Sequence, residues 1–285
     1  MRRHLFSLLL IAVALAFVVS RDPGASAKPH ALGAFGRGPT IVLVHGLGSR
    51  ATQWLGVARD LARDHRVVLA ELPGHGLASM PAQLALADAA LSLDRQIAEY
   101  GDEPVVLVGH SVGGLVAAAE AMRSPSRVRA LVLVETALRP QLGPADREAL
   151  LASLDSDYAA TLNAVYESFG RDSVQGASLA REAALMDPTT MRAWVEIAMS
   201  SDLSQQVRTL RVPLLVVLSE RSWPKDELWP ECADSLGYAG VAGAEPLRLE
   251  GTGHFVMLDR PGALAGAIRR FARGGLPEMA VAGAR

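Results

Sequence analysis

A serine between two glycines is the first feature of the sequence that could do chemistry. Gly109, Ser111 and Gly113 form a G-x-S-x-G pattern directly after the apolar run 104–108. At a strand-to-helix turn this pattern pushes the serine hydroxyl out above a sheet, because only glycine fits so tight a turn. A helix that begins at Val112 would aim its N–H groups at developing negative charge. We therefore expect Ser111 to be a nucleophile and the Val112 N–H to be an oxyanion donor.

A second glycine-rich stretch could supply the other oxyanion donor. The sequence His45-Gly46-Leu47-Gly48 follows the apolar run 40–44. Its glycines let the backbone approach a substrate carbonyl closely, so we expect the Leu47 N–H to pair with that of Val112. Gly46 is expected to lie against the substrate, and His45 to be a structural hydrogen-bonding residue.

A histidine near the end of the chain could act as the base. His254 stands in the glycine-flanked stretch 251–255, directly after a short apolar strand pattern. At that edge of a sheet its imidazole can reach Ser111 and remove the hydroxyl proton. His75 and His110 are interpreted instead as loop structure and substrate-pocket lining, and His110 is counted among the substrate-binding residues.

Strand patterns that alternate with helix patterns predict the scaffold for these groups. Continuous apolar runs of this kind are typical of parallel strands buried on both faces. The alternation favours an α/β fold with a doubly wound, mostly parallel sheet, whose ligands bind at the carboxyl ends of the strands. The predicted strands cover residues 40–44, 66–70, 104–108, 128–134, 214–218 and 246–249.

Residues 139–210 interrupt this alternation. They contain several helical segments and no convincing strand. An insertion of this length between two strands is interpreted as a helical cap over the carboxyl edge of the sheet, with a covering helix layer as the alternative. The chain then divides into a catalytic core made of 28–138 and 211–285 and the inserted cap.

Taken together, four motifs resemble those of the α/β-hydrolase superfamily, in its serine-nucleophile, esterase- and lipase-like branch. HGLG, ELPGHG at 71–76, GHSVGG and GTGHF occur in that order, and the similarity covers most of the chain after residue 27. The resemblance implies a Ser-acid-His triad with acyl-transfer or hydrolytic chemistry. It assigns the nucleophile to Ser111, the base to His254 and the oxyanion hole to Leu47 and Val112.

The acid of the triad departs from the family pattern. Members usually carry an aspartate in the loop after the penultimate strand, where this chain has Ser222. Glu135, which ends the strand pattern 128–134, is the favoured replacement because a strand end holds a carboxylate rigidly. Asp226 and Glu220 are the alternatives.

These residues together predict a serine hydrolase that cleaves a carboxylic ester through an acyl-enzyme on Ser111. Carbon–carbon bond hydrolysis, acyl transfer, cofactor-free perhydrolysis and a catalytically silent ligand-binding role stay open as alternatives. The chemistry needs no cofactor, and no cluster of histidines and carboxylates suggests a metal. We expect a small-molecule substrate.

The amino end has the pattern of a secretory signal peptide. Arg2 and Arg3 precede an apolar run from Leu5 to Val19, and an A-x-A site follows at 25–27. Cleavage after Ala27 would export the protein to the periplasm or the medium, with no stable membrane span left. An uncleaved anchor is the alternative.

Composition limits the remaining classes. The 285 residues are 50% hydrophobic and 20% charged with a formal net charge of −2, which disfavours bulk electrostatic binding of nucleic acid. The single cysteine, Cys232, excludes an internal disulfide.

Few residues separate Ala27 from the strand pattern at 40–44, so the antiparallel pair that often opens the fold hardly fits. We expect a sheet of six or seven strands.

Overall fold

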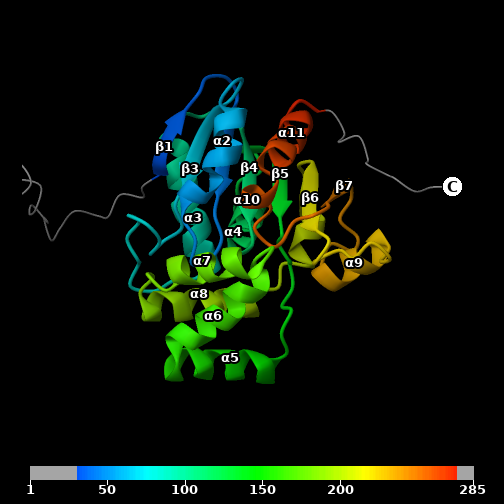
Figure 1. Cartoon of the computed structure of the whole chain (residues 1–285). Coiled ribbons are helices and arrows are strands. Elements are labelled where there is room, and N and C mark those ends of the chain that lie inside the picture. Colours follow the sequence, from blue (N-terminus) through cyan, green and yellow to red (C-terminus); the bar gives the residue numbers. More distant parts are fainter. Residues whose placement is uncertain (1–30, 275–285) are drawn as a thin grey trace, which may run out of the picture.

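A seven-stranded sheet organises residues 31–274, the part of the chain that the computed structural model describes (Figure 1). Its strand order is β1-β3-β2-β4-β5-β6-β7, and every neighbouring pair is parallel except β1 with β3. The α/β fold class is therefore confirmed. The strands are β1 (Ala31–Phe35), β2 (Thr40–Val44), β3 (Arg66–Ala70), β4 (Val105–His110), β5 (Val128–Val134), β6 (Leu214–Ser219) and β7 (Ala244–Leu249).

Helices cover both faces of this sheet. Helices α2 and α11 pack on one face, and α3, α4 and α9 pack on the other (Figure 1). The helices that flank the sheet are α2 (Leu55–Leu61), α3 (Leu86–Ala98), α4 (Val112–Arg123), α9 (Trp229–Leu236), α10 (Val256–Asp259) and α11 (Pro261–Ala272). Two short 3-10 helices are η1 (Ala51–Trp54) and η2 (Gln206–Thr209).

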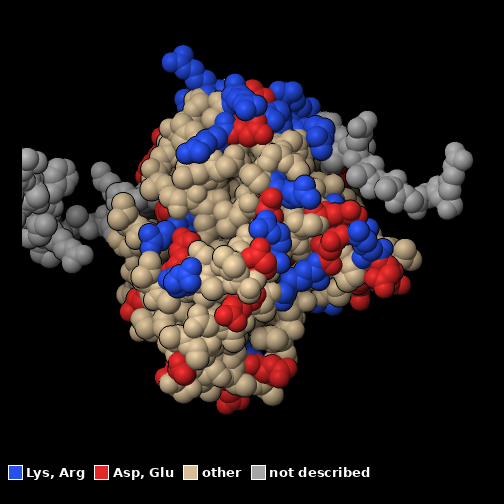
Figure 2. All heavy atoms as spheres, in the orientation of Figure 1, with Lys and Arg blue, Asp and Glu red and all other residues tan. Residues whose placement is uncertain are grey.

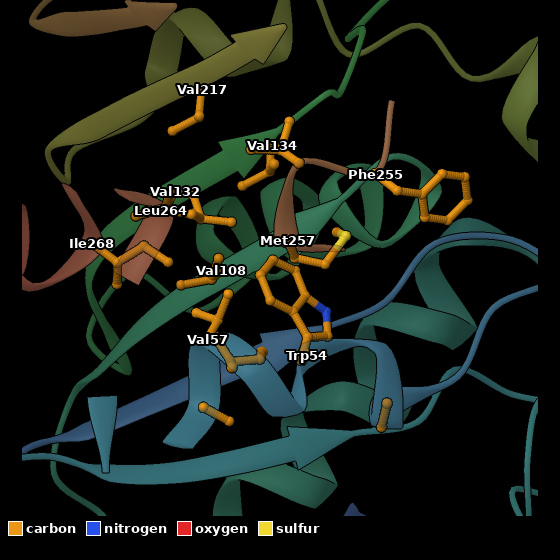
Figure 3. Packing of buried hydrophobic residues seen from close by; sticks show 14 of the residues in the cluster. Trp54, Val57, Val108, Val132, Val134, Val217, Phe255, Met257, Leu264 and Ile268 are labelled. Carbon is orange, nitrogen blue, oxygen red and sulfur yellow. The ribbon is translucent and has the colours of Figure 1, made fainter. Parts of the chain in front are cut away.

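The strand residues alternate between two hydrophobic clusters, as the period of two in a strand requires. Ile41 and Leu43 of β2 join the cluster under α2 and α11, whereas Val42 and Val44 join the one under α3 and α4. All four are fully buried. Figure 3 shows the first cluster around the indole of Trp54. Because both faces are covered, the strands carry apolar residues throughout instead of an alternating pattern.

At the amino end of the described residues, the sheet has one strand more than the six that the sequence patterns located. Within residues 31–274, the antiparallel pair that often opens the fold is absent, as expected. A single strand, β1, precedes β2 instead, and it pairs antiparallel with β3. The chain turns back through Gly36 and Gly38, both at positive φ, where a Cβ would collide with carbonyls of the turn that follows α2. Five residues are enough for a single strand, and the sheet reaches seven strands. The predicted signal peptide, 1–27, lies outside the described residues.

Between β5 and β6 the chain forms a separate layer of helices. These helices stack below the sheet in Figure 1, at the end where its loops carry the motifs. Trp194 in this layer is fully buried, and its indole N–H donates to the Pro73 carbonyl at 2.9 Å. The layer consists of α5 (Pro144–Ser156), α6 (Tyr158–Phe169), α7 (Ser173–Ala183) and α8 (Pro188–Ser200).

The distribution of surface charge and the length of the apolar helices both bear on function. On the face that Figure 2 shows, basic and acidic side chains are interspersed between larger uncharged areas. Within 31–274, no helix is both long and apolar enough to cross a membrane.

Candidate functional site

Ser111 sits at a strained turn between β4 and α4. Its backbone has φ 53° and ψ −125°, a conformation that a residue with a side chain rarely adopts. The turn is tight because a Cβ at Gly113 would collide with the His45 carbonyl, and one at Gly109 with Gly113. Val112 is the first residue of α4, so its N–H has no acceptor within the helix. The structure thus presents a serine at the amino end of a helix.

Glu135 and His254 meet next to this turn. The Oε2 atom of Glu135 lies 3.1 Å from Nδ1 of His254, and the glutamate side chain is fully buried. Glu135 also has a positive φ, 50°, directly after β5. With Nδ1 donating to the carboxylate, Nε2 of His254 keeps a free lone pair, which is the tautomer a general base needs.

The carboxylate of Glu135 is held by two further donors. Its Oε1 accepts from the backbone N–H of Ser219, and its Oε2 accepts from the hydroxyl of Ser222 at 2.8 Å. Ser222 occupies the loop position where the family pattern has aspartate. Its hydroxyl therefore points at the carboxylate that stands on the neighbouring strand. The substitution is visible in the sequence, but no local sequence pattern indicates this role of Ser222.

The other two candidate acids lie elsewhere. Glu220 is 3.0 Å from the Lys225 ammonium and accepts weakly from Gly251 N–H. The hydrogen bonds from Lys225 and from the Gly251 N–H lower the pKa of Glu220. Asp226 is exposed to solvent. Within the described residues neither makes a contact with His254, whereas Glu135 does.

The helical layer between β5 and β6 holds His254 from outside. The ring of Phe169, at the end of α6, stacks on the imidazole with centroids 4.6 Å apart. The backbone N–H of His254 donates to the Phe169 carbonyl at 3.1 Å. From the core side, Nε2–H of His110 donates to the His254 carbonyl at 2.9 Å. Sequence patterns gave no sign of Phe169, because one aromatic residue in a helix has no diagnostic neighbours.

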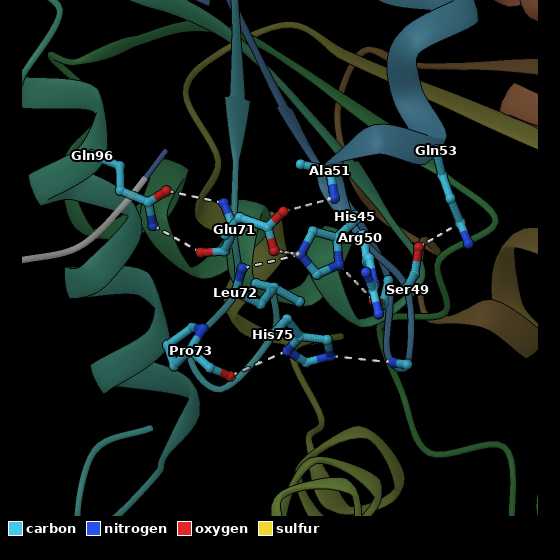
Figure 4. Close-up of polar contacts among 12 residues, drawn as sticks. His45, Ser49, Arg50, Ala51, Gln53, Glu71, Leu72, Pro73, His75 and Gln96 are labelled. Atoms are coloured by element: carbon cyan, nitrogen blue, oxygen red, sulfur yellow. Dashed lines mark hydrogen bonds and ion pairs between the residues drawn. The ribbon is translucent and has the colours of Figure 1, made fainter. Parts of the chain in front are cut away.

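The loop 45–48 is fixed from two directions, and Figure 4 shows the contact from His75. The hydroxyl of Tyr166 on α6 donates to the Leu47 carbonyl at 2.7 Å, and Nε2 of His75 accepts from the Gly48 N–H at 3.2 Å. Burial raises the pKa of Tyr166, so this phenol stays a neutral donor. Gly48 has φ 61°, and a Cβ there would collide with the Tyr166 hydroxyl. The backbone conformation around Leu47 is therefore fixed by Tyr166 and His75.

A buried polar group lies behind that loop. Nε2 of His45 accepts from the Leu72 N–H at 3.2 Å and lies 3.3 Å from the Glu71 carboxylate. Glu71 also accepts from the Ala51 N–H, and the side chain of Gln96 bonds both backbone groups of Glu71 (Figure 4). His45 thus joins the loop 45–48 to the loop after β3, in agreement with its interpretation as a structural residue.

Gly46 packs against the nucleophile region without lining the cavities around it. A Cβ at Gly46 would approach Nδ1 of His110 to 2.8 Å and the Ser111 side chain to 3.1 Å. His110 does line a cavity next to Ser111, together with Leu47 and Val112. Within 31–274, no group of three or more histidine, cysteine, aspartate or glutamate side chains is arranged to hold a metal ion.

Two buried histidines make the stability of the fold depend on pH. Burial, assisted by a neighbouring histidine in each case, lowers the pKa of His75 and of His110 well below the ordinary 6.5. Below pH 6.5 the unfolded chain therefore binds protons that the native chain does not, so stability falls as pH falls. Each histidine should lower the free energy of unfolding by an amount on the order of 1 kcal/mol between pH 7.5 and pH 5.5.

Urea unfolding at both pH values tests this expectation for His75. The His75→Gln variant should lose less of its free energy of unfolding than the native sequence over the same interval, by an amount on the order of 1 kcal/mol, because glutamine does not titrate. An equal loss in both proteins would show that His75 already binds its proton in the folded state.

Comparisons relate the chain to known proteins. A model of the alpha/beta hydrolase family matches residues 41–267. A pimeloyl-[acyl-carrier protein] methyl ester esterase of Nitrosomonas europaea is 30% identical over 201 residues, which cover 64% of this chain and 77% of the esterase. A polyketide synthase of Burkholderia thailandensis is 31% identical over 250 residues, 83% of this chain but only 12% of the synthase.

A solved structure extends the likeness to the fold. A hydrolase from Oleispira antarctica superposes with a TM-score of 0.77 at 17% identity, over 90% of this chain and 99% of that protein. The sequence motifs, the strand order and the family match, which spans most of the described residues, lead to one conclusion. The chain belongs to the alpha/beta hydrolase family.

Proposed function

We propose that the protein is a serine hydrolase that cleaves carboxylic esters through an acyl-enzyme on Ser111. Nε2 of His254 takes the hydroxyl proton while the serine oxygen attacks the ester carbonyl carbon. The imidazolium then gives that proton to the departing alcohol oxygen. Water, activated by the same histidine, hydrolyses the acyl-enzyme. Glu135 orients His254 and stabilises its charged form, and the N–H groups of Leu47 and Val112 bind the oxyanion.

One observation carries this proposal. The buried carboxylate of Glu135 lies 3.1 Å from Nδ1 of His254, next to a serine held at φ 53° by glycines. A carboxylate that accepts from Ser219 and Ser222 at the same time is fixed in position. Such a strained backbone persists only where surrounding structure enforces it, and it concentrates at functional sites. The esterase from Nitrosomonas europaea supports ester bonds as the substrate class.

The inserted helices have a role in this proposal. Residues 139–210 act as a cap whose α6 contacts both halves of the site, through Phe169 on His254 and Tyr166 on Leu47. The cap covers part of the site and shapes the space for the substrate. Export of the protein is part of the same proposal, since the sequence begins with a signal-peptide pattern.

A fluorophosphonate probe tests the nucleophile. The native protein should be labelled at Ser111, and Ser111→Ala should abolish both labelling and the hydrolysis of a chromogenic butyrate ester. Ser156→Ala, at the exposed end of α5, is the matched control and should leave both unchanged. Absence of labelling in the folded native protein would instead identify a catalytically silent member that binds a ligand.

A further inference from the structure

Two cavities of different chemistry meet at Ser111. One has a volume of about 100 Å³ and the other about 440 Å³. A substrate whose ester carbonyl lies at Ser111 would therefore extend one part into each. The residues that line both cavities are Ser111, Val112, Phe169, Ala198, Met199 and His254.

The small cavity is apolar. Helices α5, α6 and α8 supply most of its wall, and no acidic or basic side chain other than His110 and His254 lines it. Its aliphatic and aromatic wall residues include Leu150, Leu154, Leu162, Val165, Tyr166 and Met191. A wall of this kind favours a short hydrocarbon group and rejects a charge, because a buried charge without a partner is costly.

The larger cavity is an open cleft with two arginines. Arg139 and Arg221 both line it, with Gln141, Ser222 and Ser235 as further polar groups. Within the described residues, no carboxylate lies within 4.0 Å of either guanidinium. Arginine binds carboxylates and phosphates in a bidentate way, so two arginines without an ion pair suit an anion.

The position of Arg221 is set by the cap. Its guanidinium lies 5.5 Å from the ring centroid of Phe169, and its Nη1 donates to the Ser168 carbonyl. The ring of Phe169 in turn stacks on His254. The guanidinium of Arg221 and the imidazole of His254 thus both lie against the ring of Phe169.

Glu135, which lines this cleft, and Asp202, whose carboxylate interacts with the charge of Arg139, are already engaged in hydrogen bonds. Glu135 accepts hydrogen bonds from His254, Ser219 and Ser222. The carboxylate of Asp202 accepts from the backbone N–H and the hydroxyl of Ser204, which lower its pKa together with the charge of Arg139. Neither acid neutralises the arginines through direct contact.

We propose that the natural substrates are esters of an anionic alcohol with a short acyl chain. The acyl chain occupies the small apolar cavity, and a carboxylate or phosphate on the alcohol binds Arg139 and Arg221 in the cleft. The alcohol is assigned to the cleft because it must leave before water attacks, and the cleft is the larger and more open of the two cavities. His254, which protonates the leaving oxygen, is among its lining residues. This assignment rests on the proposed esterase function.

Matched pairs of butyrate esters test the proposal. The substrates are 4-carboxyphenyl butyrate and 4-phosphonophenyl butyrate, each compared with the neutral 4-carbamoylphenyl butyrate. The native protein should show a kcat/KM at least tenfold higher for one or both anionic esters. The two arms separate a carboxylate from a phosphate-like group as the preferred anion. The preference should shrink as salt concentration rises, because salt screens the attraction.

Variants locate the preference. Arg139→Gln and Arg221→Gln should each lower the anionic-to-neutral ratio of kcat/KM severalfold, and the double variant should bring it close to one. Arg59→Gln on α2 removes the same charge from an exposed position that lines neither cavity, and should keep the native ratio.

The outcomes distinguish this proposal from the one on which it rests. Hydrolysis of the neutral ester as fast as the anionic ones, or an unchanged ratio in the double variant, overturns the anion site but leaves the esterase intact. Failure to hydrolyse any of the three esters, with no labelling of Ser111, overturns both.

Discussion

Replacing Glu135 with glutamine should lower kcat for ester hydrolysis by about 10³-fold to 10⁴-fold while the protein stays folded. A glutamine is isosteric and still accepts from the Ser219 N–H, so packing around it changes little. It lacks the negative charge that stabilises the imidazolium, and its amide can donate to Nδ1 and favour the wrong tautomer of His254. Steady-state kinetics on a butyrate ester and the thermal unfolding midpoint measure both parts of the expectation.

Ser222 offers a way to move the acid and so to test it. In the double variant Glu135→Gln with Ser222→Asp, the carboxylate returns to the loop after β6, where the family pattern has it. Because the Ser222 hydroxyl lies 2.8 Å from Oε2 of Glu135, the new carboxylate should restore at least tenfold of the lost kcat. Glu220→Gln and Asp226→Asn are matched controls and should hydrolyse the ester at the native rate. Native activity in Glu135→Gln alone would exclude Glu135 as the acid.

The sheet explains why such an exchange is available. β5 and β6 are parallel neighbours, with Val134 paired to Val217 and the Glu135 N–H bonded to the Val217 carbonyl. Their carboxyl ends therefore meet at the same edge. A side chain on either loop can reach the same point beside His254. The carboxyl ends of β5 and β6 are therefore equivalent positions for the carboxylate that contacts His254.

Most of the scaffold could be predicted from the sequence because its signals are local. A run such as Ile41 to Val44 is apolar at every position, which is typical of a strand covered on both faces. The elbow at Ser111 was equally visible, since its glycines are required by backbone collisions within a few residues. Where a single strand or turn determines which residue types fit, the local sequence pattern is sufficient to predict that element.

Contacts between distant segments could not be predicted in this way. Strand β1 alternates between half-buried and exposed residues, so its sequence Ala31–Phe35 has no strong strand pattern, and only its pairing with β3 defines it. Phe169 and Tyr166 reach the site from α6. Tyr166 contacts Leu47 and Phe169 contacts His254, and each pair is separated by more than 80 residues in the sequence. Their importance lies in the folded position of the cap and not in a motif.

The contact between cap and catalytic loop leads to a second prediction with a large effect. Gly253, directly before His254, lies so close to the cap that a Cβ would stand 2.9 Å from the Phe169 carbonyl and 2.9 Å from the Arg171 N–H. Both are backbone atoms, so a side chain cannot be accommodated by a rotation. Gly253→Ala should therefore displace either the end of α6 or the loop that carries the imidazole.

The expected cost of that displacement is about 100-fold in kcat/KM, since a misplacement of about 1 Å at a catalytic group is enough for a loss of this size. The core should remain folded, because Gly253 lies outside the sheet and the helices that flank it. The control is Gly262→Ala in α11, where a Cβ meets no atom within 4 Å. That variant should keep native activity and gain up to about 1 kcal/mol in stability, because alanine favours a helix over glycine.

Kinetics and far-ultraviolet circular dichroism on both variants separate the possibilities. Full activity in Gly253→Ala would mean that the cap can move away without disturbing His254, so the stacking of Phe169 would have no part in holding the base. A loss of activity with an unchanged spectrum, while Gly262→Ala stays active, would place the cause at the contact itself. The helices inserted between β5 and β6 would then determine how the base is positioned, in addition to enclosing the substrate.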